Sequence, residues 1–515
     1  MLARGRLRRA HHRRVLLPPP GLSPALPPDA PSRGGRCVVN TSSPVLPLTV
    51  LLACSAAPAL QPDHEAPAPG PRAAEDVPRQ LGEIGRLLEA APPGATVLVQ
   101  PGVYREHLRI TRPVTLVANG AVVIDGGGSG DIIEIAAPGV TLRGFTIRNT
   151  GIDLDKENAA IRVLAPRAVI RDNIVDDVLF GIDLREAPDS LVANNRIGGK
   201  DLDIARRGDG LRLWRSDRTT VEDNVIHDGR DAILWYSKGV IVRRNTGHDC
   251  RYGLHLMFSD DVTISDNEFT RNSVGIYLMY STGVEINGNR LIQNRGPSGY
   301  GLGLKETDRF VVRGNLMVGN RSGIYIDGSP FSPDVPGEFT ANTIAGNDIG
   351  VTFLPSARGN LLHANNFIDN FNQVAVAGRG NLDANQFWKG DSGNFWSDYT
   401  GYDQNRDGVG DFVHESATLF EDLMDREPSL RLFLFSPAQQ AVEFVGRAVP
   451  AVRPEPKFTD EVPLMRPVPV AALPTGGSPA RIPLAAGGAL LVTLGGSLLG
   501  LARDPAVRPA HGGVR

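Results

Sequence analysis

Cysteine is almost absent from this chain of 515 residues: it has three, and only Cys250 lies beyond residue 59. A disulfide framework needs pairs of cysteines, so none is expected in the body of the chain. A strong net charge is also missing, since 54 basic side chains face 57 acidic ones. No basic stripe runs along the chain, which excludes nucleic acid as a partner.

The first 59 residues have no repeat and are expected to be a targeting segment. Residues 1–43 are rich in Arg and Pro, which predicts disorder or a misplaced translation start. The apolar segment Pro44–Ala59 predicts a signal peptide. Cys54 fits the acylated cysteine of a lipoprotein, whereas Ala57-Pro-Ala59 suits ordinary signal cleavage. Both alternatives predict export, with residues 60–76 as a linker.

The other end carries a candidate membrane segment. Residues 482–502 contain no charge and lie between Arg481 and Arg503, and 21 residues are about enough to cross a bilayer. Their many glycines count against insertion. A Pro-rich linker is expected at 468–481 and a tail at 503–515.

An asparagine returns through the middle of the chain, most often after 22 residues and otherwise after 20 to 29. Apolar residues lie three positions before each one and, except at Gly247, two positions after it. The series is Asn173, Asn195, Asn224, Asn245, Asn267, Asn289, Asn315, Asn342, Asn365 and Asn385. A repeat of this length is too short for two helices, and a buried turn asparagine can stack in ladders.

A second strand in each repeat alternates apolar and polar residues, as in Gly253-Leu-His-Leu-Met, so one face is buried and the other faces outward. The pattern predicts an all-β fold, a right-handed parallel β-helix over residues 77–392. Val77–Ala91 has helical apolar spacing and is expected to cap its open end. A mixed extension over 393–467 follows. A core of this size folds without metal.

Two outward columns follow from aligning these strands. One contains Asp183, Arg212, Leu234, His255, Tyr277, Gly303 and Tyr325; the other contains Arg185, Trp214, Tyr236, Met257, Met279, Lys305 and Asp327. Exposed aromatic and methionine side chains indicate a contact surface. We therefore expect partner binding at Trp214, Tyr236, Tyr277 and Lys305.

His255, Met257 and Met279 form the candidate metal site. An imidazole and two thioethers suit Cu(I) better than hard cations, so the three residues are candidate ligands for transient copper. The alternative is that the methionines are adaptable packing residues of a docking surface. His227, His248 and Cys250 form a second candidate soft cluster, which we expect in the turns of the same coils.

A calcium loop is the next candidate, just beyond the solenoid. Asp403, Asn405, Asp407 and Asp411 follow the spacing of oxygen ligands around calcium, with Gly408 at the sharp turn. Its twelfth position is His414, and a glutamate arrives one residue late. A full EF-hand is therefore not expected, which leaves a short structural calcium loop or a plain Asx-rich turn.

One alternative function is enzymatic. A β-helix polysaccharide lyase or epimerase acting on uronate polymers needs clustered carboxylates and a base, whereas Asp183, Arg185 and Arg212 look scattered. We predict no catalysis by this chain.

Ser436 and Pro437 predict a helix start. The apolar stripe that follows either caps the last coil or binds a membrane partner.

The chain resembles the NosD family of nitrous oxide reductase maturation proteins, over roughly residues 75 to 467. The resemblance rests on RYGLHLMFSDD from Arg251, MYS from Met279, YGLGLKETD from Tyr300, GNFWSDYTGYDQNRDGVGD from Gly393, LFEDLMDREPSLRLFLFSPAQQAVEF from Leu419 and PLM from Pro463.

This resemblance implies a periplasmic, membrane-associated accessory protein of denitrification. Its implied partners are an ABC transporter made of a NosF-like ATPase and a NosY-like permease, a NosL-like copper chaperone, and nitrous oxide reductase, whose copper–sulfide centre the complex assembles. In that setting the soft outward side chains would receive copper or hold a partner.

Overall fold

A computed structural model describes residues 82–469 except positions 333, 379, 417, 435 and 453. The predicted targeting segment, the linker at 60–76, most of the linker at 468–481, the candidate span at 482–502 and the tail lie outside the described residues. Within residues 82–469, no helix combines the length and the apolar character needed to span a membrane.

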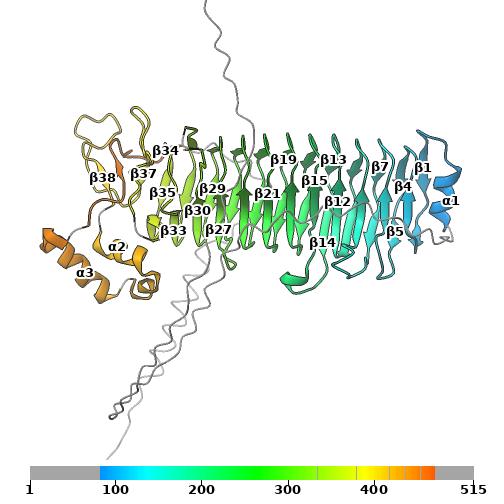
Figure 1. Cartoon of the computed structure of the whole chain (residues 1–515), viewed down its shortest axis with the longest axis horizontal. Helices are drawn as coiled ribbons and strands as arrows, with labels where there is room; N and C mark the ends of the chain where they lie inside the picture. Colours follow the sequence, from blue (N-terminus) through cyan, green and yellow to red (C-terminus); the bar gives the residue numbers. More distant parts are fainter. Residues whose placement is uncertain are drawn as a thin grey trace, which may run out of the picture. The chain divides into compact units, whose positions relative to one another are not determined.

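The described residues form a right-handed parallel β-helix with three long sheets, which confirms the predicted fold class (Figure 1). Sheet A consists of β1 (Thr96–Val99), β4 (Thr115–Ala118), β7 (Thr141–Arg143), β10 (Val169–Arg171), β13 (Leu191–Ala193), β16 (Thr220–Glu222), β19 (Ile241–Arg243), β22 (Thr263–Ser265), β25 (Glu285–Asn287), β28 (Val311–Arg313), β31 (Gly337–Thr340) and β34 (Asn360–His363).

Sheet B consists of β2 (Gly102–Tyr104), β5 (Val122–Asp125), β8 (Thr146–Arg148), β11 (Ile174–Val178), β14 (Arg196–Gly199), β17 (Val225–His227), β20 (Thr246–His248), β23 (Glu268–Thr270), β26 (Arg290–Ile292), β29 (Leu316–Val318), β32 (Thr343–Ala345), β35 (Asn366–Ile368) and β37 (Phe395–Trp396). Sheet C consists of β3 (Leu108–Ile110), β6 (Ile133–Ile135), β9 (Ala159–Val163), β12 (Phe180–Arg185), β15 (Leu211–Trp214), β18 (Asp231–Trp235), β21 (Tyr252–Met257), β24 (Val274–Met279), β27 (Tyr300–Lys305), β30 (Ser322–Asp327), β33 (Ile349–Phe353) and β36 (Asn372–Val376).

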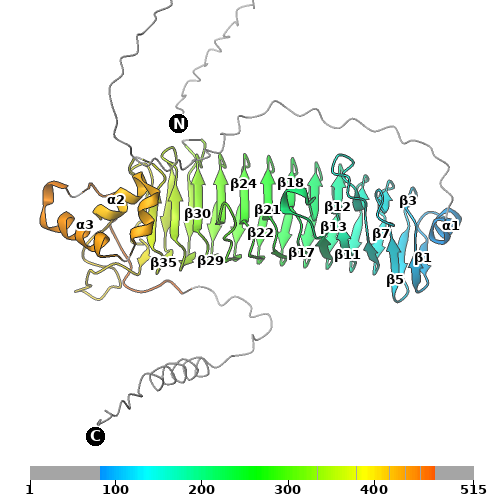
Figure 2. The same ribbon diagram turned by 90° about the horizontal axis from the view of Figure 1, so that it is seen from below.

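Helices lie near the two ends of the solenoid (Figures 1 and 2). The helix α1 (Glu83–Ala90) buries Ile84 and Leu88 against the first coil. Beyond the last coil follow α2 (Leu419–Arg426), η2 (Pro428–Phe433), α3 (Pro437–Ala448) and η3 (Pro450–Val452). A two-stranded pair, β38 (His414–Glu415) with β39 (Thr459–Asp460), lies in the same extension, and the 3-10 turn η1 (Ile204–Arg206) projects between β14 and β15.

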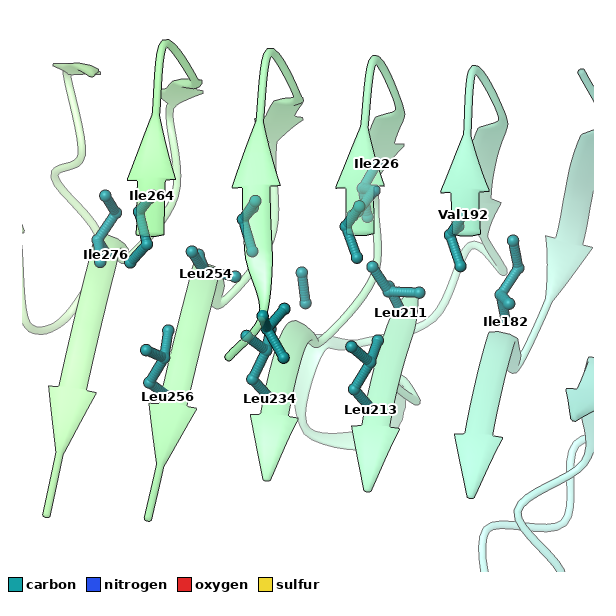
Figure 3. Packing of buried hydrophobic residues seen from close by; sticks show 14 of the residues in the cluster. Ile182, Val192, Leu211, Leu213, Ile226, Leu234, Leu254, Leu256, Ile264 and Ile276 are labelled. Carbon is teal, nitrogen blue, oxygen red and sulfur yellow. The ribbon is translucent and has the colours of Figure 1, made fainter. Parts of the chain in front are cut away.

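The core is a column of apolar side chains, mainly aliphatic with some phenylalanines, from all three sheets. Leu213, Leu234 and Leu256 lie one above another on sheet C and face Val192 and Ile264 across the interior (Figure 3). Each is fully or almost fully buried. Because neighbouring strands are roughly 4.8 Å apart, equivalent positions of successive coils are in contact, and the same holds on the outer face.

The repeated asparagine forms a buried ladder along one corner of the solenoid. The Nδ2 atom of Asn173 donates to Oδ1 of Asn195 at 3.0 Å, and the same bond continues through Asn365. The ladder then continues to Asn394 and not to Asn385, which corrects the predicted series. Asn385 accepts from Asn360 in a different column. These bonds satisfy buried amides that would otherwise cost about 1–3 kcal/mol each.

The carboxylate of Asp460 ends this ladder. It accepts from the backbone N–H of Asn394 at 2.7 Å and from the indole N–H of Trp396 at 2.9 Å. Asp460 belongs to β39, so the C-terminal extension is joined to the last coil through the same polar column that runs through the core.

One outward alignment was wrong at the coil of β18. Asp231, not Ala232, takes the place of Gly210, since Leu211 pairs with Ala232 and Trp214 with Trp235. Leu234 therefore points into the core, and Ile233 and Trp235 replace Leu234 and Tyr236 in the outward columns. The slip arises because the coil starts with a buried aspartate, whereas the alignment assumed a small residue there.

Candidate functional site

The outer face of β21 and β24 brings the predicted soft donors together. Leu254 and Leu256 point into the core, so His255 and Met257 point outward on the alternate side. Met257 pairs in register with Met279 on the next coil. The Nε2 atom of His255 lies 3.4 Å from Sδ of Met279. Met257 and Met279 are half-buried, whereas His255 is only 5% exposed.

The second ring nitrogen of His255 faces a buried carboxylate. Nδ1 lies 3.4 Å from Oδ2 of Asp231, which is fully buried and also accepts two bonds from Arg251. Burial alone would raise the pKa of Asp231, but the nearby imidazole of His255 and the hydrogen bonds and positive charge of Arg251 outweigh it and hold the pKa below its usual value. Sequence analysis missed Asp231 because it lies one coil earlier, at a strand start.

Aromatic rings enclose the histidine on the same face. The ring of Tyr252 meets His255 edge-on at 4.9 Å, and the ring of Tyr277 lies 6.1 Å away. Tyr277 folds over Gly303, where an added Cβ would come within 2.3 Å of the ring. Burial raises the pKa of the Tyr277 phenol well above its usual value. The small residue at position 303 thus makes room for Tyr277, and the predicted docking residue is largely covered.

The second outward column runs beside this site. It reads Trp214, Trp235, Met257, Met279, Lys305 and Asp327 in successive coils. The guanidinium of Arg215 lies 4.9 Å from the Trp214 ring. The indole nitrogen of Trp235 is buried and has no hydrogen-bond partner among the described residues.

Tyr236 lies in a turn and not in a strand, and it begins an aromatic ladder. Its ring stacks on Phe258 at 5.1 Å, Phe258 stacks on Tyr280 at 4.9 Å, and Nζ of Lys305 lies 5.7 Å from the Tyr280 ring. Tyr236 and Phe258 are 44% and 41% exposed. All three rings sit at backbone φ values of 51° to 56°, a strained region for bulky residues. The alternating pattern of the sequence applies to strand positions only, so it did not predict a ladder of aromatic rings at turn positions.

The preceding coils carry a closed network of charges on the same outer face. Arg212 donates to both oxygens of Asp183, at 2.8 and 2.9 Å, and to Glu157. Arg162 and Arg185 also bind Asp183. Burial would raise the pKa of this carboxyl, but the three arginines lower it to about 2. A carboxylate that is fully buried and paired with three arginines is poorly placed to act as a base or to bind a calcium ion.

The second soft cluster divides into two parts. His227 and His248 are the last residues of β17 and β20, not turn residues, and their rings stack at 5.3 Å. Their Nδ1 atoms face Asp228 at 2.9 Å and Asp249 at 2.7 Å. Cys250 instead points into the core, where burial raises the pKa of its thiol to about 12. The three side chains therefore do not converge.

In the candidate calcium loop, carboxylates accept backbone hydrogen bonds. Asp403 accepts from the backbone N–H groups of Asp407 at 3.2 Å and Gly408 at 2.9 Å, and Asp411 accepts from that of Gln404 at 2.7 Å. His414 is buried against the ring of Trp396 at 4.8 Å, and burial lowers its pKa to about 4. Across the described residues, no three or more His, Cys, Asp or Glu side chains are arranged to hold a metal ion.

The helical extension has one buried face and one exposed face. Phe420 and Met424 of α2 are buried, and α2 contacts β36 of the last coil. In α3, which begins at Pro437 with Ser436 as its N-cap as predicted, Phe444 and Val445 remain 69% and 45% exposed. Capping of the last coil thus falls to α2, and α3 leaves an apolar face uncovered.

Comparison with known proteins identifies the family. A family model described as "Periplasmic copper-binding protein (NosD)" matches residues 193–401. A "Probable ABC transporter binding protein NosD" from Pseudomonas aeruginosa is 33% identical over 379 residues, which cover 71% of this chain and 87% of that protein. The chain belongs to the NosD family. A protein of the same name from Stutzerimonas stutzeri is 31% identical, covering 73% of this chain and 91% of that one.

Solved structures with similar coils include the Dettilon tailspike protein (gp208), with a TM-score of 0.46 and 14% identity over 59% of this chain and 65% of that one. The A-module of the Azotobacter vinelandii mannuronan C-5 epimerase AlgE4 has a TM-score of 0.44 and 14% identity, covering 58% of this chain and 91% of that one. Scores this low carry no information about the chemistry of this NosD-family chain.

Proposed function

We propose that this chain is a periplasmic accessory protein that receives copper and docks partners while the copper–sulfide centre of nitrous oxide reductase is assembled. The description of the matched family as periplasmic and copper-binding supports this proposal, as do relatives named as ABC transporter binding proteins. Copper is cargo in this proposal, and the chain itself is not a catalyst. The energy comes from a NosF-like ATPase acting through a NosY-like permease.

One observation carries the copper-handling part: Nε2 of His255 lies 3.4 Å from Sδ of Met279, beside Met257 in register. One imidazole and two thioethers are a donor set that favours Cu(I) over hard cations such as Ca²⁺ or Mg²⁺. In the preceding coils, arginines and carboxylates neutralise one another. The soft donors at His255, Met257 and Met279 have no charged partner on their outer side. They are therefore the described side chains best suited to receive a soft cation.

Docking is assigned to the surfaces beside the donors. The exposed rings of Tyr236 and Phe258, together with Trp214 and Lys305, would contact a NosL-like chaperone or the reductase, because exposed aromatic residues are enriched where proteins meet. The uncovered face of α3 would contact the permease and so hold the protein at the membrane. A calcium ion at Asp403 to Asp411 would have only a structural role.

A titration with Cu(I) under reducing conditions, in competition with a chromophoric chelator, tests the proposal. Wild type should bind one Cu(I). His255→Gln and the double variant Met257→Leu with Met279→Leu should each bind at least ~10-fold more weakly, because soft donors are lost. Met465→Leu is the matched control, since Met465 is also half-buried but lies in the C-terminal extension, and its affinity should equal that of wild type.

Docking is tested separately with the apo-reductase. Binding of the reductase should differ between the copper-loaded and the copper-free protein. Equal binding in both states, with equal copper affinity in all variants, would leave a docking module that handles no copper and would contradict the proposal.

A further inference from the structure

Two buried aspartates lie on consecutive coils, just before β15 and at the start of β18, and each is paired with an arginine at the start of the next coil. Asp209 accepts from Arg230 at 3.0 and 3.2 Å, and Asp231 accepts from Arg251. Both carboxylates are at most 2% exposed. They differ in one respect: Asp231 also faces the Nδ1 atom of His255, and Asp209 has no ion pair with a histidine among the described residues.

The neighbours of His255 distinguish its two neutral tautomers. A carboxylate is only an acceptor, so an Nδ1 atom without a proton would direct its lone pair at Oδ2 of Asp231 from 3.4 Å, inside a buried environment where repulsion is weakly screened. A proton on Nδ1 instead places a positive partial charge next to that oxygen, a favourable electrostatic contact even though the 3.4 Å approach lacks the geometry of a hydrogen bond. The proton then leaves Nε2 with a free lone pair, and Nε2 is the atom that lies next to Met279.

We infer that Asp231 is the positioning residue of the candidate copper site: it keeps the histidine proton on Nδ1, so that Nε2 of His255 presents its lone pair beside the thioether of Met279. This inference rests on the proposed function, because it takes Nε2 as a metal ligand. Histidines that bind metals commonly donate their other N–H to a carboxylate, which fixes the tautomer and raises the basicity of the ligand.

Arg251 fixes the carboxylate in turn. Its Nε donates to Oδ1 of Asp231 at 2.9 Å, and its Nη2 donates to Oδ2, the oxygen that faces the histidine. The guanidinium also lies 4.6 Å from the ring of Tyr252, which touches His255 edge-on. An amide cannot replace this carboxylate, since asparagine offers only one acceptor oxygen. Its NH₂ group must face either Arg251 or the histidine, and the second choice moves the proton to Nε2.

Nitrogen-15 NMR of the metal-free full chain, labelled at histidine and held at pH 8, reads the tautomer directly. The signals of His255 are assigned by their loss in His255→Gln. We expect the Nδ1–H tautomer in wild type and in Asp209→Asn, the matched control that also removes a buried carboxylate charge. In Asp231→Asn the population should shift toward Nε2–H, and Cu(I) affinity should fall about 10 to 100-fold, with no fall in Asp209→Asn.

The outcomes separate the inference from the proposed function. An Nε2–H tautomer in wild type overturns the role of Asp231, whatever the copper affinity is. So does an equal loss of affinity in both asparagine variants, which would indicate a structural role. An Nδ1–H tautomer in a wild-type protein that binds no Cu(I) upholds the positioning by Asp231 and overturns the proposed function. Circular dichroism shows whether Asp231→Asn folds. If it does not, the tautomer of His255 in the wild-type protein still tests the inference.

Discussion

Two stretches of the outer face of sheet C use equivalent strand positions in opposite ways. On β9, β12 and β15, buried arginines and carboxylates neutralise each other around Asp183. On β18, β21 and β24, the corresponding positions hold Ile233, His255 and Tyr277, flanked by tryptophan and methionine. In the first stretch the carboxylates are paired with arginines, whereas the second presents soft atoms that are not bound to any charge on their outer side.

The difference shows how a solenoid separates stability from function. The coils from Asn173 to Asn394 share an apolar interior and an asparagine corner, so the interior does not require any particular outer face. The charged stretch holds its coils together through buried ion pairs, which are costly to break on one side only. The soft stretch lacks such a network, and its buried carboxylate, Asp231, faces a histidine.

Removal of one partner from the charged stretch should have the largest effect on stability. Arg212→Ala removes one of the three arginines that bind Asp183 and a two-bond partner of Glu157, and removing one partner from a buried ion pair costs about 3–5 kcal/mol of unfolding free energy. Unfolding in urea measures this loss. Cu(I) affinity should not change. Arg215→Ala, on the exposed turn beside it, should stay within about 0.5 kcal/mol of wild type. If Arg212→Ala also lost no more than about 0.5 kcal/mol of unfolding free energy, the role of the network would be contradicted.

Acid should weaken the same stretch. The folded pKa of Asp183 is about 2, below the unfolded value of about 3.9. The unfolded state therefore binds the proton first as the pH falls. The stability that Asp183 contributes is complete above about pH 5 and disappears as the pH falls through 2, a change of about 2 kcal/mol.

Comparison of wild type with Asp183→Asn isolates this contribution, because the other carboxylates titrate alike in both proteins. The difference in unfolding free energy should shrink steadily as the pH is lowered from 5 toward 2. A difference that stays constant over this range would mean that the network does not lower the pKa of Asp183.

A smaller effect is expected in the soft stretch from Gly303→Ala. The new Cβ would overlap the ring of Tyr277, so the ring must leave its place, at a cost of about 1–3 kcal/mol. Thermal unfolding measures the cost. In the double variant with Tyr277→Ala the clash is absent, so the two losses should not add. If the two losses of stability simply add, the position of the Tyr277 ring does not depend on the absence of a side chain at Gly303.

The fold was predictable from sequence because its interior repeats. Asparagine spacing and alternation gave the β-helix and placed His255, Met257 and Met279 on one face. Prediction failed where a coil departs from the repeat: Asp231 takes a position assumed to hold a small residue, which shifted the alignment of that coil by one. The ladder also ends at Asn394 and Asp460, since the chain inserts a loop after Val376 that spacing alone does not reveal.

Other parts of the site depend on contacts between coils that spacing does not encode. The pairing of Asp231 with His255 joins a strand start to the middle of the next strand. The ladder of Tyr236, Phe258 and Tyr280 lies at turn positions outside the alternating pattern. Cys250 looked like a partner of His248 from its place in the chain, but its side chain points to the opposite side, into the core.

X-ray absorption at the copper edge of the Cu(I)-loaded protein tests the central claim most directly. The account predicts a metal with one imidazole nitrogen and two sulfur neighbours in wild type, one sulfur fewer in Met279→Leu, and no nitrogen in His255→Gln. A shell of nitrogen and oxygen alone, or a shell that is the same in all three proteins, would contradict it.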